Sequence, residues 1–95
     1  MAQVRRHHDY ELDLQLDRAI AAWQELAEVE HEIGGWDLVD QLVFIEEWPL
    51  EEERLRRLAE SDRTGAFTTS QRGLYERLLR LVARQRPIID RLRTD

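Results

Sequence analysis

The chain of 95 residues carries 20 acidic residues, 14 arginines and no lysine, for a net charge of −6. This length allows one small domain with a thin core, and the absence of cysteine excludes disulfides, thiolate zinc sites and cysteine nucleophiles. No run of about 18 apolar residues is present, so we expect no membrane span. Because the first residues also lack the apolar core of a secretory signal, we expect a cytoplasmic protein.

The first predicted element is a helix over about residues 10–33. Apolar and polar residues alternate over residues 10–16, which alone would fit a short strand, but apolar residues then continue at the spacing of a helix face. They are Leu12, Leu16, Ala19, Ile20, Trp23, Leu26 and Ala27. We expect residues 1–8 to form a frayed tail, Asp9 to cap the helix, and Gly34-Gly35 to end it in the left-handed conformation that glycine accepts.

A second helix is predicted over about residues 36–60. Its broad apolar face, which we assign to the core, carries Val39, Leu42, Val43 and Ile45. The opposite stripe carries Asp37, Asp40, Gln41, Glu47 and Glu51. Pro49 lies in the middle, where proline removes a backbone hydrogen bond and crowds the carbonyl of Ile45. We therefore expect a helix that continues through Pro49 with a kink.

A third helix is predicted over about residues 68–93. Thr68 and Gln71 have the spacing of a capping box, which marks a helix start. The expected core line is Leu74, Leu78, Leu81, Val82, Ile88, Ile89 and Leu92. Pro87 is expected to kink the helix near its end. The fold class is therefore all-α: residues 9–95 form a small antiparallel three-helix bundle with kinked second and third helices, which we expect to be oligomeric.

Charge is unevenly distributed along the chain. Residues 1–62 hold 17 acidic residues and 6 arginines, whereas residues 63–95 hold 3 acidic residues and 8 arginines. The pattern indicates two acidic helices packed beside a basic one. The alternative is a nucleic-acid surface on the last helix, but a net acidic chain without a basic cluster disfavours it, so we expect no nucleic-acid partner.

Three polar residues fall on faces that are otherwise apolar. Glu30 continues the core line of the first helix, Glu46 lies among the aliphatic residues of the second, and Gln85 lies in the core stripe of the third. A buried carboxylate needs a partner. We expect a buried polar network of Glu30, Glu46, Gln85 and Arg86 that sets the helix register; partial exposure of these side chains is the alternative.

Two large aromatic residues fall on the acidic stripe of the second helix. Phe44 and Trp48 are four residues apart, so they lie side by side on one helix face. One interpretation is an aromatic pair shielded by its neighbours. The favoured one is an interface, because adjacent exposed aromatic residues are typical anchors for a protein partner.

The spacing Glu28-x-x-His31 is the only one typical of a metal site, because helical di-iron proteins use Glu-x-x-His. A better buried set would be Glu30, His31 and Glu46, completed between subunits. This hypothesis would imply iron or manganese as cofactor. A second such motif and further inward carboxylates are missing, so the favoured expectation is that no metal and no other cofactor is bound.

No catalytic residues are predicted, because the chain has neither a nucleophile motif nor a glycine-rich phosphate loop. The sequence favours a small non-enzymatic interaction or assembly protein that acts as a homo-oligomer, with its second helix at the centre of a homodimer and a second protein as a further partner. The alternative is a ferritin-like metal carboxylate protein. No family resemblance is evident.

Overall fold

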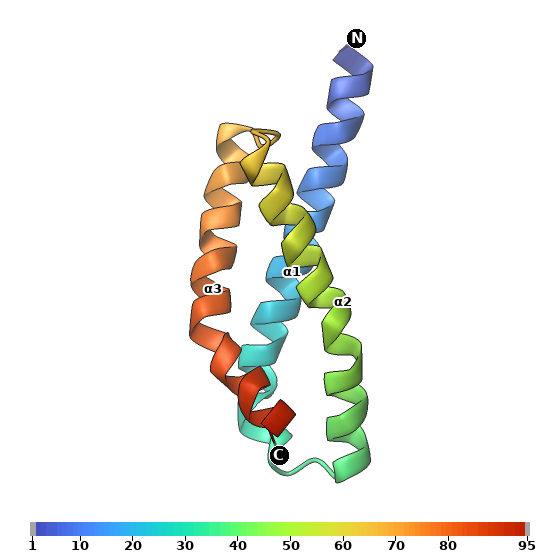
Figure 1. Cartoon of the computed structure of the whole chain (residues 1–95), viewed down its shortest axis with the longest axis vertical. Coiled ribbons are helices and arrows are strands. Elements are labelled where there is room, and N and C mark those ends of the chain that lie inside the picture. The colour runs from blue at the N-terminus through green and yellow to red at the C-terminus, as the bar shows by residue number, and fades with distance from the viewer. Residues whose placement is uncertain (1, 95) are drawn as a thin grey trace.

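The computed structural model describes the backbone of residues 2–94 and the side chains of residues 10–92. In this range the chain forms three α-helices and no strand: α1 (Ala2–Ile33), α2 (Leu38–Arg63) and α3 (Thr69–Thr94). Each helix runs antiparallel to the one before it, so α1 and α3 point in the same direction (Figure 1). The prediction of an all-α fold with three packed helices is confirmed.

The bundle is elongated, with extents of 51 × 21 × 19 Å. The N-terminal turns of α1 project beyond the other two helices, and the C-terminus lies at the end where α1 joins α2 (Figure 1). α1 packs most extensively against α3, although these two helices are not neighbours in the sequence, and α2 packs least against α3. α1 is therefore the helix on which the other two are assembled.

The start of α1 differs from the prediction. The helix begins at Ala2 rather than near residue 10, so the segment expected to be frayed is helical. Asp9 lies inside the helix and not at its N-cap, and its side chain is outside the described ones. The physical reason is that residues 2–9 contain no glycine or proline, so nothing stops the helix from extending back from its packed part.

The connection between α1 and α2 is closed by hydrogen bonds rather than by a left-handed glycine. α1 ends at Ile33 as expected, but Gly65 (φ 75°), which follows α2, has the only positive φ in the described backbone. Gly35 N–H donates to the carbonyl of Glu32 at 2.8 Å. The side-chain amide of Gln41 donates to the carbonyl of Ile33 at 2.9 Å, so a side chain of α2 satisfies the end of α1.

Side-chain caps begin the second and third helices. A side-chain oxygen of Asp37 accepts a hydrogen bond from Asp40 N–H at 2.9 Å. Before α3, Thr68 Oγ1 accepts from Gln71 N–H at 3.1 Å, and Gln71 Oε1 accepts from Thr68 N–H at 2.9 Å. The predicted capping box is confirmed, because both reciprocal bonds form.

The core is supplied very unequally by the three helices. Its buried members are Leu12, Leu16, Ala19, Ile20, Trp23, Leu26 and Ile33 of α1, Trp48 and Leu58 of α2, Phe67, and Tyr75, Leu78, Val82, Ile88 and Ile89 of α3. The predicted faces of the first and third helices therefore point inward. α2 contributes only two of these residues, although it continues unbroken through Pro49 for its whole length.

Candidate interaction surfaces

Trp48, predicted to be displayed on the outside, belongs to the core. It is only 5% exposed, and its ring meets that of Trp23 edge-on, with centroids 4.8 Å apart and planes at 78°. Phe44 stacks on its other side at 5.8 Å, with planes at 23°. Both geometries are favourable for aromatic pairs. The prediction that Trp48 is an exposed anchor for a partner is therefore wrong.

Phe44 is half-buried within the same cluster. Its ring also meets that of Trp36 edge-on, at 5.8 Å and 72°. The aromatic side of α2 thus faces α1. Of the aliphatic face that the pattern assigned to the core, Ile45 is partly buried against the core, whereas Val39, Leu42 and Val43 are exposed. Packing Trp48 against Trp23, with Phe44 stacked on Trp48, removes more apolar surface from water than burying leucine and valine would, which explains this rotation of the helix.

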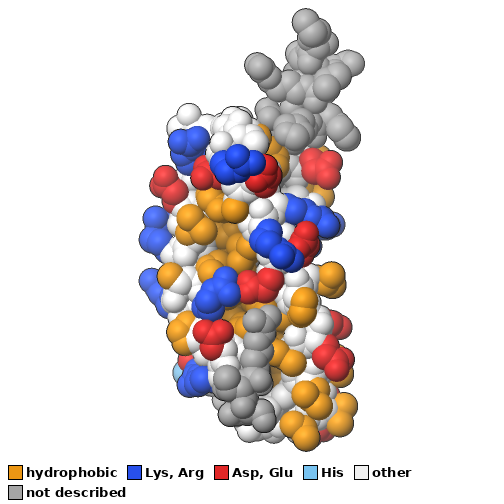
Figure 2. Space-filling model, in the orientation of Figure 1, with side chains coloured by type: hydrophobic (Ala, Val, Ile, Leu, Met, Phe, Trp, Pro, Cys, Tyr) orange, Lys and Arg blue, Asp and Glu red, His pale blue; other side chains and the backbone are white. Residues whose placement is uncertain are grey.

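The rotation leaves an aliphatic surface uncovered along the first half of α2. Five large side chains on it are about half exposed or more: Leu38 (70%), Val39 (67%), Leu42 (48%), Val43 (50%) and Leu50 (71%). They form what we call the outer face of α2. Hydrophobic side chains gather at this end of α2, next to its connection with α1 (Figure 2). Such a contiguous apolar surface is typical of a protein–protein contact.

A shallow groove lies between α2 and α3, with a volume of about 570 Å³. Its apolar lining consists of Pro49, Leu55, Ala59, Tyr75, Leu79 and Val82. In Figure 2 apolar side chains gather between the two helices. Burial, and secondarily the carboxylate of Asp62, raise the pKa of the Tyr75 phenol above its ordinary value. That group therefore stays protonated at neutral pH.

An ion pair crosses this groove. The guanidinium of Arg86 donates to both carboxylate oxygens of Glu52, at 2.7 and 3.1 Å, and lies 5.6 Å from the ring centroid of Trp23. The hydrogen bond to Glu52 raises the pKa of Arg86 above its ordinary value, so its charge is permanent. Arg86 joins α3 to α2 and to α1, as a register-setting residue would, but its partner is Glu52 and not Glu46.

The expected buried polar network does not form as predicted. Glu46 is exposed, because the rotation of α2 carries it outward with the aliphatic residues. Glu30 is also exposed and pairs loosely with Arg91 of α3 at 3.7 Å. Gln85 alone is buried as its position in the stripe indicates. The polar contact that Arg86 does make is with Glu52.

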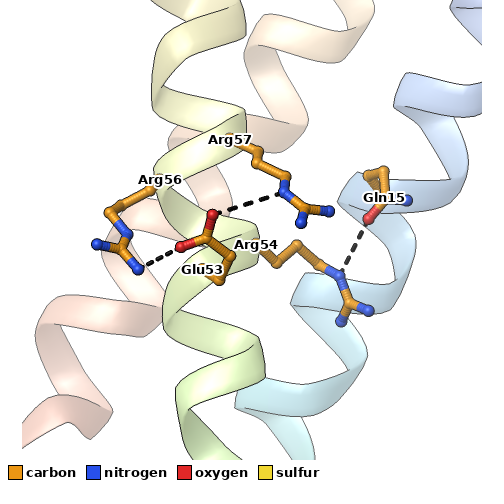
Figure 3. A network of polar contacts seen from close by, with 5 residues as sticks. All are labelled: Gln15, Glu53, Arg54, Arg56 and Arg57. Carbon is orange, nitrogen blue, oxygen red and sulfur yellow. Dashed lines mark hydrogen bonds and ion pairs between the residues drawn. The ribbon is translucent and has the colours of Figure 1, made fainter.

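Two further polar contacts join α1 to its neighbours. Gln71 is buried, and its side-chain amide donates to Asp13 at 2.9 Å. Arg54 Nε donates to Gln15 Oε1 at 3.1 Å, which connects α2 to α1 (Figure 3). The same arginine also donates to Glu51 at 2.7 Å. Each of these bonds involves a charged group, which makes it stronger than a neutral hydrogen bond.

The candidate metal ligands do not come together. Among the described side chains, no group of three or more His, Cys, Asp or Glu residues is placed to hold a metal ion. Glu28, Glu30 and His31 are all exposed on α1, and Glu46 is exposed on α2. A motif at helical spacing is not sufficient for a site, because its other ligands must converge from facing helices.

The pattern did contain a signal for the outer face of α2. Leu38-Val39 and Leu42-Val43 are aliphatic pairs four residues apart, and Leu50 follows two turns later. A helix that is apolar nearly all round must either be buried on every side or leave one side for a partner. In a three-helix bundle only one side of each helix can face the core, so one of the two apolar sides of α2 had to remain uncovered.

None of the helices in the described part of the chain is long and apolar enough to cross a membrane. Comparison of the chain with protein-family models, with curated proteins and with solved structures gives no match. Function is therefore inferred from the surfaces of the molecule alone.

Proposed function

We propose that the protein is a non-enzymatic assembly protein that acts as a homo-oligomer, with the outer face of α2 as the contact between copies. The observation that carries the proposal is the uncovered aliphatic surface formed by residues 38–50 of α2. Water is a poor solvent for such a surface, and each Å² of apolar surface removed from water contributes about 25 cal/mol. Two copies that pair through the same face would cover it on both molecules.

We include in the proposal a bend of α2 at Pro49 and another of α3 at Pro87, because proline inside a helix removes a hydrogen bond and crowds the preceding turn. A bend at Pro49 separates the aliphatic first half of α2 from its second half. In that second half Glu53 pairs with Arg56 and with Arg57, and Glu60 pairs with Arg63. In the first half, the aliphatic side chains of the outer face remain largely uncovered.

Replacing Leu42 by glutamate should break the contact between copies. The change places a charge in the middle of the outer face, and two copies of it in a symmetric dimer. We expect the dissociation constant of the dimer to rise by about a hundredfold or more, since about 1.4 kcal/mol corresponds to tenfold. Sedimentation equilibrium measures this change, and the far-ultraviolet circular dichroism should remain that of a folded helical protein.

Leu79→Glu is the matched control for this substitution. Leu79 is 45% exposed, close to the 48% of Leu42, but it lies on α3 beside the groove and not on the outer face of α2. We expect this variant to dimerise like the unchanged protein. The proposal is refuted if the unchanged protein stays monomeric up to millimolar concentration, or if the two variants dissociate equally.

Replacing Glu46 by leucine should strengthen the same contact. Glu46 lies on the outer face, three residues after Val43 and four before Leu50, and is exposed in the single chain. Burying a carboxylate without a partner is costly. We expect Glu46→Leu to lower the dissociation constant by about tenfold, in the direction opposite to Leu42→Glu. An unchanged or raised dissociation constant would place Glu46 outside the contact.

A further inference from the structure

Three exposed acidic residues form a line along the outside of α1. Glu25, Glu28 and Glu32 are spaced by three and four residues, so they lie one above the other on a single helix face. That face is opposite the one that buries Trp23 and Leu26. We call these three residues the acidic line.

Three exposed arginines form a line with the same spacing along the outside of α3. Arg77, Arg80 and Arg84 are again separated by three and four residues, on the face opposite Leu78 and Val82. Basic side chains follow the edge of the molecule formed by α3 (Figure 2). We call these residues the arginine line. Both lines cover about 10 Å of helix, given a rise of 1.5 Å per residue.

Neither line is neutralised within the molecule. Among the described side chains, no member of the acidic line or of the arginine line forms an ion pair or a side-chain hydrogen bond. The second half of α2 is different, because it carries charges of both signs that pair locally, as Glu53 does with Arg56 and Arg57 (Figure 3). Like charges three and four residues apart weaken a helix, so both lines would be stabilised by an opposite charge.

The two lines cannot meet within one chain. α1 and α3 pack through their buried faces, and each line lies on the opposite side of its helix. In the single chain both lines are therefore balanced only by water and counterions, and an opposite side-chain charge could come only from another molecule. A second copy of this chain carries a line of opposite sign with identical spacing, so in parallel register each arginine can meet one carboxylate.

We propose that the arginine line of one copy binds the acidic line of a second copy. The two surfaces differ, so a copy bound on one side still offers the other line to a third copy. Such a head-to-tail contact closes into a ring or extends into a filament. It is separate from the outer face of α2, and it would link dimers formed there into a larger assembly. Because exposed ion pairs are screened by salt, the contact weakens as ionic strength rises.

Two triple variants with reversed charge test this pairing. The acid-reversed variant carries Glu25→Arg, Glu28→Arg and Glu32→Arg. The arginine-reversed variant carries Arg77→Glu, Arg80→Glu and Arg84→Glu. Each variant alone presents the same sign of charge on both surfaces, so neither should self-associate through this contact. Mixed in equal amounts, they present opposite signs again, and association should return.

Sedimentation velocity reads out the result, at about 50 and about 500 mM NaCl, which span the screening range. All proteins carry Leu42→Glu, so that the outer face of α2 does not contribute. We expect salt-sensitive association of the parent protein, its loss in each reversed variant, and its recovery in the mixture. The matched control reverses three exposed arginines that lie outside both lines, Arg57→Glu, Arg63→Glu and Arg72→Glu, and should associate like the parent.

Two results would overturn the proposal. The first is a mixture that associates no more than its separate components. The second is a parent protein that does not self-associate at about 50 mM NaCl but binds a duplex DNA of about 20 base pairs, with that binding lost in the arginine-reversed variant. The second result would assign the arginine line to nucleic acid. Both leave the contact through α2 untouched, since that contact is tested separately by Leu42→Glu against Leu79→Glu.

Discussion

Trp48→Ala should lower the free energy of unfolding by about 3–5 kcal/mol, a large part of the stability of a domain this small. The substitution removes a ring that is 5% exposed and packs between Trp23 and Phe44, at centroid distances of 4.8 and 5.8 Å. Trp48 is also one of only two buried residues of α2. Urea unfolding followed by circular dichroism measures the loss.

Two matched variants make this result specific. Trp48→Phe keeps an aromatic ring in the cluster and removes an indole N–H that is buried without a hydrogen-bond partner among the described residues, so it should cost much less than alanine. Leu50→Ala lies two residues further along α2 but is 71% exposed. Its effect should be within about 0.5 kcal/mol for the monomer and should grow only at concentrations where copies associate. A large loss for Leu50→Ala in the monomer, with a small one for Trp48→Ala, would show that α2 is rotated the other way.

Gln71→Ala should lower the free energy of unfolding by about 2–3 kcal/mol. The side chain is 2% exposed and combines two functions, since it closes the capping box with Thr68 and donates to the carboxylate of Asp13 on α1. Loss of a cap costs about 1 kcal/mol, and loss of a hydrogen bond to a charged group about 1.5–3 kcal/mol. Together these would amount to about 2.5–4 kcal/mol, but Asp13 is exposed and regains water, so we expect a total near or slightly below the lower end of that sum.

Thr68→Ala separates the two functions of Gln71. It removes the hydroxyl that accepts from Gln71 N–H at 3.1 Å and leaves the bond to Asp13 in place, so about 1 kcal/mol should be lost. Thermal unfolding of both variants provides the comparison. Equal losses for the two substitutions would mean that the contact between Gln71 and Asp13 contributes nothing to stability.

Local signals in the sequence predicted the elements of the fold. The capping box of Thr68 and Gln71 formed as its spacing indicates, α1 ends at Ile33, and the core lines of α1 and α3 face inward. These features depend on residues within a few positions of each other. The start of α1 was missed because Asp9 was expected to cap the helix, although residues 2–9 contain no helix-breaking residue.

The orientation of α2 could not be predicted in the same way. Its aliphatic side, with Val39 and Leu42, and its aromatic side, with Phe44 and Trp48, are both apolar, so helical periodicity alone allows either to face the core. The choice depends on Trp23, a residue of another helix that is positioned to meet an aromatic ring. The placement of Glu46 followed from that choice, and it was wrong for the same reason.

Polar partners between helices were equally hard to predict. Arg86 was expected near Glu46, but it binds Glu52, which lies six residues further along α2 on a different face. A long, flexible arginine side chain can reach many positions. Which carboxylate it meets depends on the axial register between the two helices, that is, on how far one is shifted along the other. This register is set by the packing of the whole core and not by the residues beside Arg86.

The unequal packing of the three helices has a consequence for how the chain folds. The most extensive helix contact joins α1 and α3, which are separated in the sequence by all of α2, whereas α2 buries only Trp48 and Leu58. A hairpin of α1 and α2 would therefore form early but gain little stability until α3 is present. The rate-limiting step of folding is then the docking of α3 onto α1, which closes a loop that contains all of α2. The chain should therefore fold more slowly than a bundle whose most extensive contacts join helices adjacent in sequence.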